Sequence, residues 1–372
     1  MALSTTSAAR RAGHPGTSRP AARRLMLLAV TLTALMGAGA CAAAPEPEVP
    51  DPITVTPTIA PNRAVAPEPD VPVVWPLTGV ETEEVAARPA VAVKIENTTA
   101  ARPQSGLESA DVVWETVVEF EVSRLIAVFH SQVPEEIGPI RSVRPMDPPI
   151  TSPLHGLLAF SGGQPGILTL VRNSPVQAIS HDAGAPGLYR VSHRSAPHNV
   201  YGNLQTFIDS ADADHQAPPA EQFAFGLRPS LAGAVRAGTP AATLSFRLSG
   251  QARPSWTWDA ASGTWLRSEG SSAATDANGN RLSAVNVVAI TAPHPPSGYR
   301  AQGGASVPTY ELVGEGDAVV ATGGMTVAGR WSKAANDAPL QLFGTDGSPL
   351  LLAPGNTWVE LIPAGKGSLT IG

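Results

Sequence analysis

Cysteine is almost absent from this sequence, since Cys41 is the only one among 372 residues. A single thiol excludes an internal disulfide, so a folded region outside the cytoplasm would depend on apolar cores for its stability. Hydrophobic residues make up 43% of the chain, which is enough to build such cores. Lysine is nearly as rare, with three residues, and arginine therefore carries most of the positive charge.

Several signatures of chemistry are also missing. The chain has no His-Glu-x-x-His zinc motif, no Gly-x-Ser-x-Gly nucleophile motif and no glycine-rich phosphate loop. The run from Asp276 to Asn280 places its glycine too early for an EF-hand calcium loop. The sequence therefore predicts no metal site and no cofactor. Its net charge of −6, without a basic stripe, also excludes a nucleic acid as partner.

The amino terminus has the features of an export signal. Five arginines precede an apolar stretch from Met26 to Met36, and small residues then lead directly into Cys41. The apolar stretch is too short for a permanent membrane span, which takes about 20 residues. We expect residues 1–40 to be a cleaved signal peptide and Cys41 to receive a lipid anchor, including a fatty acid such as palmitate. An ordinary signal peptidase site before an incidental cysteine is the alternative.

Composition divides the rest of the chain. Residues 41–74 hold the predicted lipidated cysteine and a proline-rich linker, typical of an extended spacer. Residues 75–239 alternate predicted strands with helices at 148–156, 165–172 and 203–213, which indicates an α/β layered N-terminal domain. Residues 240–364 show short strand patterns and hairpin turns, which indicate an antiparallel, β-rich C-terminal domain before a tail at 365–372. The predicted fold class is α+β overall.

Charged residues interrupt two of the apolar segments. A hairpin between the strand patterns at 111–118 and 122–131 would place Glu115 approximately opposite Arg124. In IGPIRSVRP, residues 137–145, prolines stiffen the backbone around Arg141 and Arg144, whose charge is permanent. One interpretation is a clamp for an anionic carboxylate or phosphate. The other is that each arginine is consumed by an internal acid such as Glu115 or Asp111.

Histidines supply the remaining candidates. His198 and Asn199 follow Pro197 in a loop, where His198 has the chemistry of a general base and Asn199 that of a substrate-orienting amide. The alternative is that both side chains fix the loop and cap the next helix. His181, beside Asp182, is a second candidate base. An enzyme would need such a base within about 3 Å of a nucleophile or a positioned water.

A series of motifs between residues 75 and 364 resembles the YerB-like bacterial lipoproteins, a family built from domain of unknown function 3048 in two parts. The motifs are PLTG at 76–79, ARPQSGL at 101–107, AVFHS at 127–131, IGPIRSVRP, APHN at 196–199 and PGNTWVELIP at 354–363. Phe120-Glu121 stands at a join that family members often make with glycine. The resemblance implies a two-part architecture outside the cytoplasm and carries no established activity.

Together these features predict an extracytoplasmic lipoprotein anchored to the cell membrane. Its expected partner is an anionic or polar envelope ligand, such as a small molecule or glycan, or an envelope protein. The predicted ligand-binding residues are Arg141, Arg144, Arg124, Glu115, His198 and Asn199. The alternative function is a cell-envelope hydrolase that uses His198 or His181 as general base.

Overall fold

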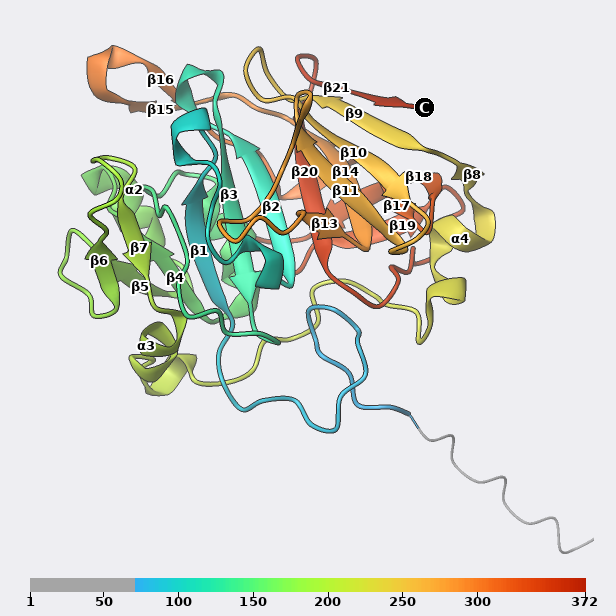
Figure 1. Ribbon diagram of the computed structural model, residues 1–372, viewed down its shortest axis with the longest axis horizontal. Coiled ribbons are helices and arrows are strands. Elements are labelled where there is room, and N and C mark those ends of the chain that lie inside the picture. Colours follow the sequence, from blue (N-terminus) through green and yellow to red (C-terminus); the bar gives the residue numbers. More distant parts are fainter. Residues whose placement is uncertain (1–70) are drawn as a thin grey trace, which may run out of the picture. The chain divides into compact units, whose positions relative to one another are not determined.

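One sheet of 11 strands draws on both halves of the sequence. The computed structural model describes residues 71–372 (Figure 1). The predicted signal peptide, Cys41 and the linker up to residue 70 lie outside the described residues. The strands of this long sheet are β1 Val91–Glu96, β2 Val112–Val117, β3 Ser123–Phe129, β4 Leu157–Phe160, β5 Gln177–Ser180, β8 Thr239–Pro240, β14 Asn286–Ala292, β17 Gly314–Thr322, β18 Met325–Lys333, β19 Gln341–Gly344 and β20 Thr357–Pro363.

The late strand β20 joins the two halves. The strands follow the order β19-β18-β17-β14-β20-β2-β3-β1-β4-β5, and β8 pairs with β18. In Figure 1, β20 therefore lies between β14 and β2, and it runs parallel to both. The expectation of a purely antiparallel C-terminal half was wrong at this point, because five strands intervene between β14 and β20 and return the chain in the same direction. The domain division at residue 239 stays a prediction.

A second sheet and two small hairpins complete the strands. The second sheet has the order β12-β11-β10-β9-β21, with β13 on β11. Its strands are β9 Thr243–Arg247, β10 Pro254–Asp259, β11 Thr264–Glu269, β12 Ser272–Ala273, β13 Ser283–Ala284 and β21 Ser368–Ile371. The hairpins are β6 Leu188–Arg190 with β7 Val200–Gly202, and β15 Pro296–Arg300 with β16 Ser306–Pro308.

The helices are short. The α-helices are α1 Asp147–Thr151, α2 Pro165–Arg172, α3 Leu204–Asp209 and α4 Gly233–Ala237, and the 3₁₀ turns are η1 Thr99–Ala101, η2 Leu107–Ser109, η3 Glu119–Glu121, η4 Ser152–Leu154, η5 Ala213–His215, η6 Pro229–Leu231 and η7 Gln302–Gly304. The helix predicted at 148–156 breaks into α1 and η4, where Pro153 cannot donate to the preceding turn. The described chain is mostly strand, and the predicted α/β layering is not confirmed. None of the helices between residues 71 and 372 is long and apolar enough to cross a membrane.

The long sheet is covered on both faces. Side chains alternate along each strand, so Trp114 of β2 points to one face and Val113 to the other. We call the first the α1 face, because Ile150 of α1 packs into its core. The second is the β11 face, because Trp265 of β11 packs into the core on that side, between the two sheets.

The hairpin between β2 and β3 has a register that corrects one expectation. Arg124 lies opposite Thr116, and Glu115 lies opposite Leu125. The hairpin closes around the three residues of η3, through a hydrogen bond from Val118 N to Val122 O. This shifts the predicted pairing by one residue. Because side chains alternate, Glu115 points to the β11 face and Arg124 to the α1 face, so they form no pair.

Candidate functional site

Two of the predicted clamp arginines share one glutamate on the α1 face. Arg144 Nε donates to Glu119 Oε2 at 2.7 Å, and its Nη2 donates to Glu119 Oε1. Arg124 Nη2 is 3.5 Å from the same Oε1, and Arg124 Nη1 donates to the Ser142 carbonyl at 2.7 Å. The partner of both arginines is therefore Glu119, and neither of the expected acids, Glu115 and Asp111, takes part.

The same cluster continues to α1 and shifts several pKa values. Lys94 Nζ lies 2.7 Å from Asp147 Oδ1, and both side chains are fully buried. Burial lowers the pKa of Lys94 to about 8, and burial followed by repulsion from Arg144 lowers the pKa of Arg124 to about 9. Burial opposes ionisation of Glu119, but the two arginines outweigh it and lower its pKa to about 2. The cluster ties IGPIRSVRP to the hairpin and to α1.

Arg141 and His198 share a second glutamate. Arg141 Nε is 3.4 Å from Glu96 Oε2, and its Nη1 donates to the Pro197 carbonyl at 3.1 Å. His198 Nδ1 lies 2.9 Å from both carboxylate oxygens of Glu96. Asn199 is elsewhere, where its Oδ1 accepts from Arg190 Nη1 at 2.6 Å. Glu115 lies on the β11 face. The six predicted residues therefore occupy four separate places: Arg124 with Arg144, Arg141 with His198, Asn199 alone and Glu115 alone.

Neither candidate base lies beside a nucleophile. His181 Nδ1 is 3.1 Å from Asp182 Oδ1, and His198 is held by Glu96. Among residues 71–372, neither imidazole makes a hydrogen bond to a serine or threonine hydroxyl. The same part of the chain contains no group of three or more His, Cys, Asp or Glu side chains that could hold a metal ion. The geometry offers no support for a histidine-dependent hydrolase.

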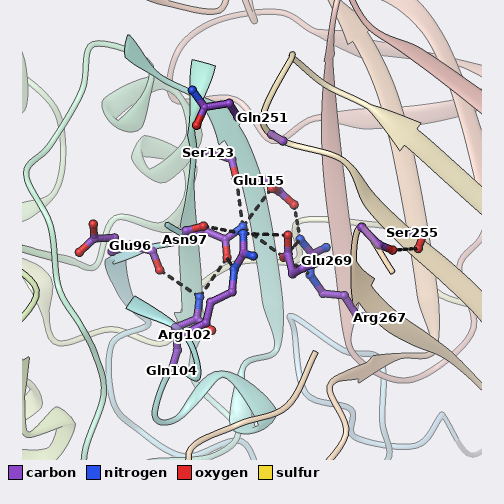
Figure 2. A network of polar contacts seen from close by, with 12 residues as sticks. Glu96, Asn97, Arg102, Gln104, Glu115, Ser123, Gln251, Ser255, Arg267 and Glu269 are labelled. Atoms are coloured by element: carbon purple, nitrogen blue, oxygen red, sulfur yellow. Dashed lines mark hydrogen bonds and ion pairs between the residues drawn. The ribbon is translucent and has the colours of Figure 1, made fainter. Parts of the chain in front are cut away.

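A cavity of about 440 Å³ opens on the β11 face, in a place that the sequence did not predict. Figure 2 shows the polar network along its wall, in which Asn97, which follows β1, points toward Glu115 of β2 and Glu269 of β11. The lining combines polar side chains with an apolar wall that includes Leu107, Leu125 and Leu282. Its polar members are Asn97, Thr99, Arg102, Gln104, Arg267, Glu269, Ser272 and Thr275.

Arg267 of β11 is the centre of this network. Its guanidinium is buried against two indole rings, 5.3 Å from the ring centroid of Trp256 and 4.4 Å from that of Trp358. Nη1 donates to Glu360 Oε1 at 2.8 Å. Nη2 donates to Glu115 Oε2 and, at 2.7 Å, to Glu269 Oε1. One cation thus meets three carboxyl groups from β2, β11 and β20.

The pKa values of the two most deeply buried of these carboxyl groups shift in opposite directions. Glu115 and Glu360 lie opposite each other on β2 and β20, and both are fully buried. Burial opposes ionisation of Glu115, but attraction by Arg267 outweighs it and lowers its pKa. Burial, and then the neighbouring Glu115 carboxylate, raise the pKa of Glu360 well above its ordinary value. Of the two carboxyl groups, Glu360 is therefore the one that holds a proton more readily.

The charged side chains around the cavity are paired. Arg102 Nη2 is 3.0 Å from Glu269 Oε2, while its Nε donates to Asn97 Oδ1 at 3.1 Å. Asn97 in turn donates to Glu115 and Glu269. Arg267, the other arginine of the lining, is paired with Glu115, Glu269 and Glu360. The wall presents no unpaired charge to a ligand.

Several uncharged polar groups of the lining stay unpaired. Within the described part of the chain, the hydroxyls of Thr99, Ser272 and Thr275 make no hydrogen bond. Gln104 Nε2 donates to the Glu96 carbonyl and to Asn97 Oδ1, both at 3.0 Å, which fixes the direction of its amide. Its Oε1 accepts from no described residue. The cavity therefore offers both donors and acceptors to a neutral ligand.

Comparisons with known proteins show the family. The N-terminal domain of the protein of unknown function DUF3048 matches residues 77–217, and the C-terminal domain of the same family matches residues 244–359. The two models together cover more than half of the chain. The chain belongs to the DUF3048 family.

Relatives of this DUF3048 protein agree with its fold. It is 33% identical over 139 residues to YerB of Bacillus subtilis (strain 168), named as a candidate lipoprotein. That match covers 37% of this chain and 42% of YerB, less than half of the relative's length. The crystal structure of the Bacillus subtilis YerB protein matches with a TM-score of 0.69 at 23% identity, covering 80% of this chain and 99% of that one. The structural likeness shows the fold.

The cavity residues left weak signals in the sequence. Arg102 and Gln104 belong to the ARPQSGL motif, and Glu360 is the one charged residue in the apolar strand TWVELIP. A glutamate in such a strand indicates a buried partner. Arg267 gave no signal, because it is followed by polar Ser268 and Glu269 in β11, and an arginine among polar residues is typical of an exposed position.

We expect Glu119→Gln to destabilise the protein at neutral pH more than at low pH. The unfolded chain has the ordinary pKa of 4.5 and the folded protein about 2, so ionised Glu119 stabilises the fold above pH 4.5. This contribution is lost as the pH falls toward about 2. Urea unfolding at about pH 7 and about pH 3, with exposed Glu83→Gln as control, measures the difference. An equal loss at both pH values would contradict the assignment.

Proposed function

We propose that the protein is an extracytoplasmic lipoprotein, anchored to the membrane through Cys41, whose folded region binds a polar ligand without net charge. The anchor is supported by the export signal before Cys41 and by the similarity to YerB, which is named as a candidate lipoprotein. Because less than half of YerB is matched, its role is not transferred to this chain.

The single observation that supports this ligand class is the contrast between paired charges and unpaired hydroxyls in the cavity. A charged ligand would have to break the Arg102–Glu269 pair or remain without a counter-charge, and either costs free energy. A neutral, hydroxyl-rich ligand can instead bind Thr99, Ser272 and Thr275 without disturbing any ion pair. The volume of about 440 Å³ lies within the usual range of roughly 300–1,000 Å³ for small-molecule sites.

The apolar part of the lining fits the same class. The uncharged side chains of this part are Leu107, Leu125 and Leu282, which can contact the C–H face of a sugar ring. A saccharide unit combines such a face with hydroxyl groups on its edge. We therefore favour a neutral glycan unit over the anionic ligand that the arginines of IGPIRSVRP suggest, since Glu119 and Glu96 already neutralise those arginines.

For the anchor, we expect Cys41→Ser to release the protein from the membrane. The thiol is the only one in the chain, so no other cysteine can replace it. Incorporation of labelled palmitate and fractionation of cells into membrane and soluble parts measure the effect. Retention of the label and of the membrane fraction in the variant would exclude Cys41 as the anchor.

For the ligand, three glucose derivatives that differ in charge provide the probes. Saturation-transfer NMR on the full chain should detect neutral N-acetylglucosamine, but not cationic glucosamine or anionic glucuronic acid. The double variant Ser272→Ala/Thr275→Val removes two lining hydroxyls and no ion pair, and should weaken binding about tenfold. Exposed Arg228→Gln, which lies outside the cavity lining, is the control.

The charge series decides the ligand class. Equal binding of glucuronic acid would contradict a neutral site, and binding that survives in the double variant would place the ligand elsewhere.

A further inference from the structure

A groove beside the tip of the β2–β3 hairpin has no role in the proposed function. It has a volume of about 570 Å³. Its lining comes from η3, from the turn at 248–250, from β15 and β16, and from residues 363–366. We call it the η3 groove. The η3 groove and the cavity of about 440 Å³ on the β11 face share no lining residue.

We propose that the η3 groove is a docking surface for an extended, acidic peptide segment that carries an apolar side chain. This inference does not depend on the ligand of the cavity. Three features of the groove support it: an exposed phenyl ring on a constrained backbone, accessible proline rings in the lining, and exposed positive charge that contrasts with the rest of the protein.

The phenyl ring belongs to Phe120. Its side chain is 59% exposed, the largest exposed fraction of any aromatic side chain noted among the described residues. Phe120 and Glu121 have φ angles of 62° and 59°, a region that side-chain-bearing residues rarely adopt. Hydrogen bonds hold both: Ser249 Oγ donates to the Glu121 carbonyl at 2.5 Å and Gln251 Nε2 to the Phe120 carbonyl at 3.0 Å. Strained backbone that is fixed in this way is typical of binding sites.

Part of the groove lining is apolar. The accessible apolar surface comes from the rigid rings of Pro296 and Pro308, from separate segments. Val117, Val118, Leu248 and Pro363 also belong to the lining but are almost fully buried. A surface of this kind accepts an aliphatic or aromatic side chain without an ordering cost in its own side chains, because proline rings are already fixed.

The exposed charge of the groove is positive on an acidic protein. The whole chain carries −6, yet Arg247 and Lys366 lie exposed in the groove lining. Glu121 is the one exposed acid of the lining, so two cations stand against one carboxylate there. The other acid of the lining, Glu119, is buried and paired with Arg144. The exposed surface is therefore complementary to a partner that carries carboxylates.

The concave shape favours a peptide over a membrane. The apolar surface is recessed between charged turns, where a single side chain can enter while neighbouring carboxylates reach Arg247 and Lys366. A bilayer is flat on this scale and contacts protruding apolar side chains rather than the floor of a recess. An extended segment also needs little ordering beyond its own backbone.

Two matched hexapeptides test the proposal: fluorescein-labelled Glu-Glu-Phe-Pro-Glu-Glu, and the same peptide with lysine in place of glutamate. Fluorescence anisotropy with the full chain should show binding of the acidic probe at least tenfold tighter than that of the basic one. Arg247→Gln/Lys366→Gln should weaken it at least tenfold. Phe120→Gly should weaken it at least fivefold while the thermal midpoint does not fall, because glycine suits the positive φ. Arg228→Gln should leave it unchanged.

Three results would overturn the proposal. The first is binding of the acidic probe that is no tighter than that of the basic one, and the second is binding that survives in both groove variants. The third result comes from vesicles of phosphatidylglycerol mixed with the Cys41→Ser chain, which has no lipid anchor of its own. Vesicle binding that requires Phe120, without any binding of the acidic probe, would make the groove a membrane-contact surface instead.

Discussion

A single buried guanidinium connects the two sheets of this fold. Arg267 extends from β11 of the smaller sheet, packs against Trp256 and Trp358, and meets Glu115 and Glu360 of the long sheet. Those two carboxyl groups belong to β2 and β20, the neighbouring strands through which the two halves of the sequence pair. Desolvating a cation and two carboxyl groups costs several kcal/mol per ion, so the contact is favourable only while every partner is in place. The arrangement of both halves depends on it.

The same contact determines the character of the cavity. Arg267 is paired with Glu115, Glu269 and Glu360, and Arg102 is paired with Glu269, so neither arginine of the wall has a charge free for a ligand. The network also fixes the direction of the amides that face the cavity, since hydrogen bonds from fixed partners remove their rotational freedom. A preorganised and partly hydroxylated wall whose charges are paired is the physical basis for the proposed glycan binding.

The sequence predicted local elements better than their partners. The strands β1 and β4 and the helix α2 lie where the apolar patterns place them, because those patterns depend on near neighbours. The position of β20 between β14 and β2 depends on contacts more than 200 residues apart, and no local pattern encodes it. IGPIRSVRP indicated fixed arginines, but the sequence did not show their partners. Arg141 pairs with Glu96 of β1, and Arg144 pairs with Glu119, in a turn whose three-residue length also shifted the hairpin register by one. Arg267 resembled an exposed residue because polar Ser268 and Glu269 follow it in the sequence.

The most direct test of this account is the stability of Arg267→Met and of Arg267→Met/Glu115→Gln in urea. A methionine side chain fills much of the volume that Arg267 occupies beside the indole rings. It leaves Glu115 buried without a counter-charge. The account predicts that the single variant loses about 3–5 kcal/mol of unfolding free energy, and that neutralising Glu115 in the double variant restores part of it. A single variant as stable as the parent chain, or a double variant that loses the sum of both changes, would contradict the central place of Arg267.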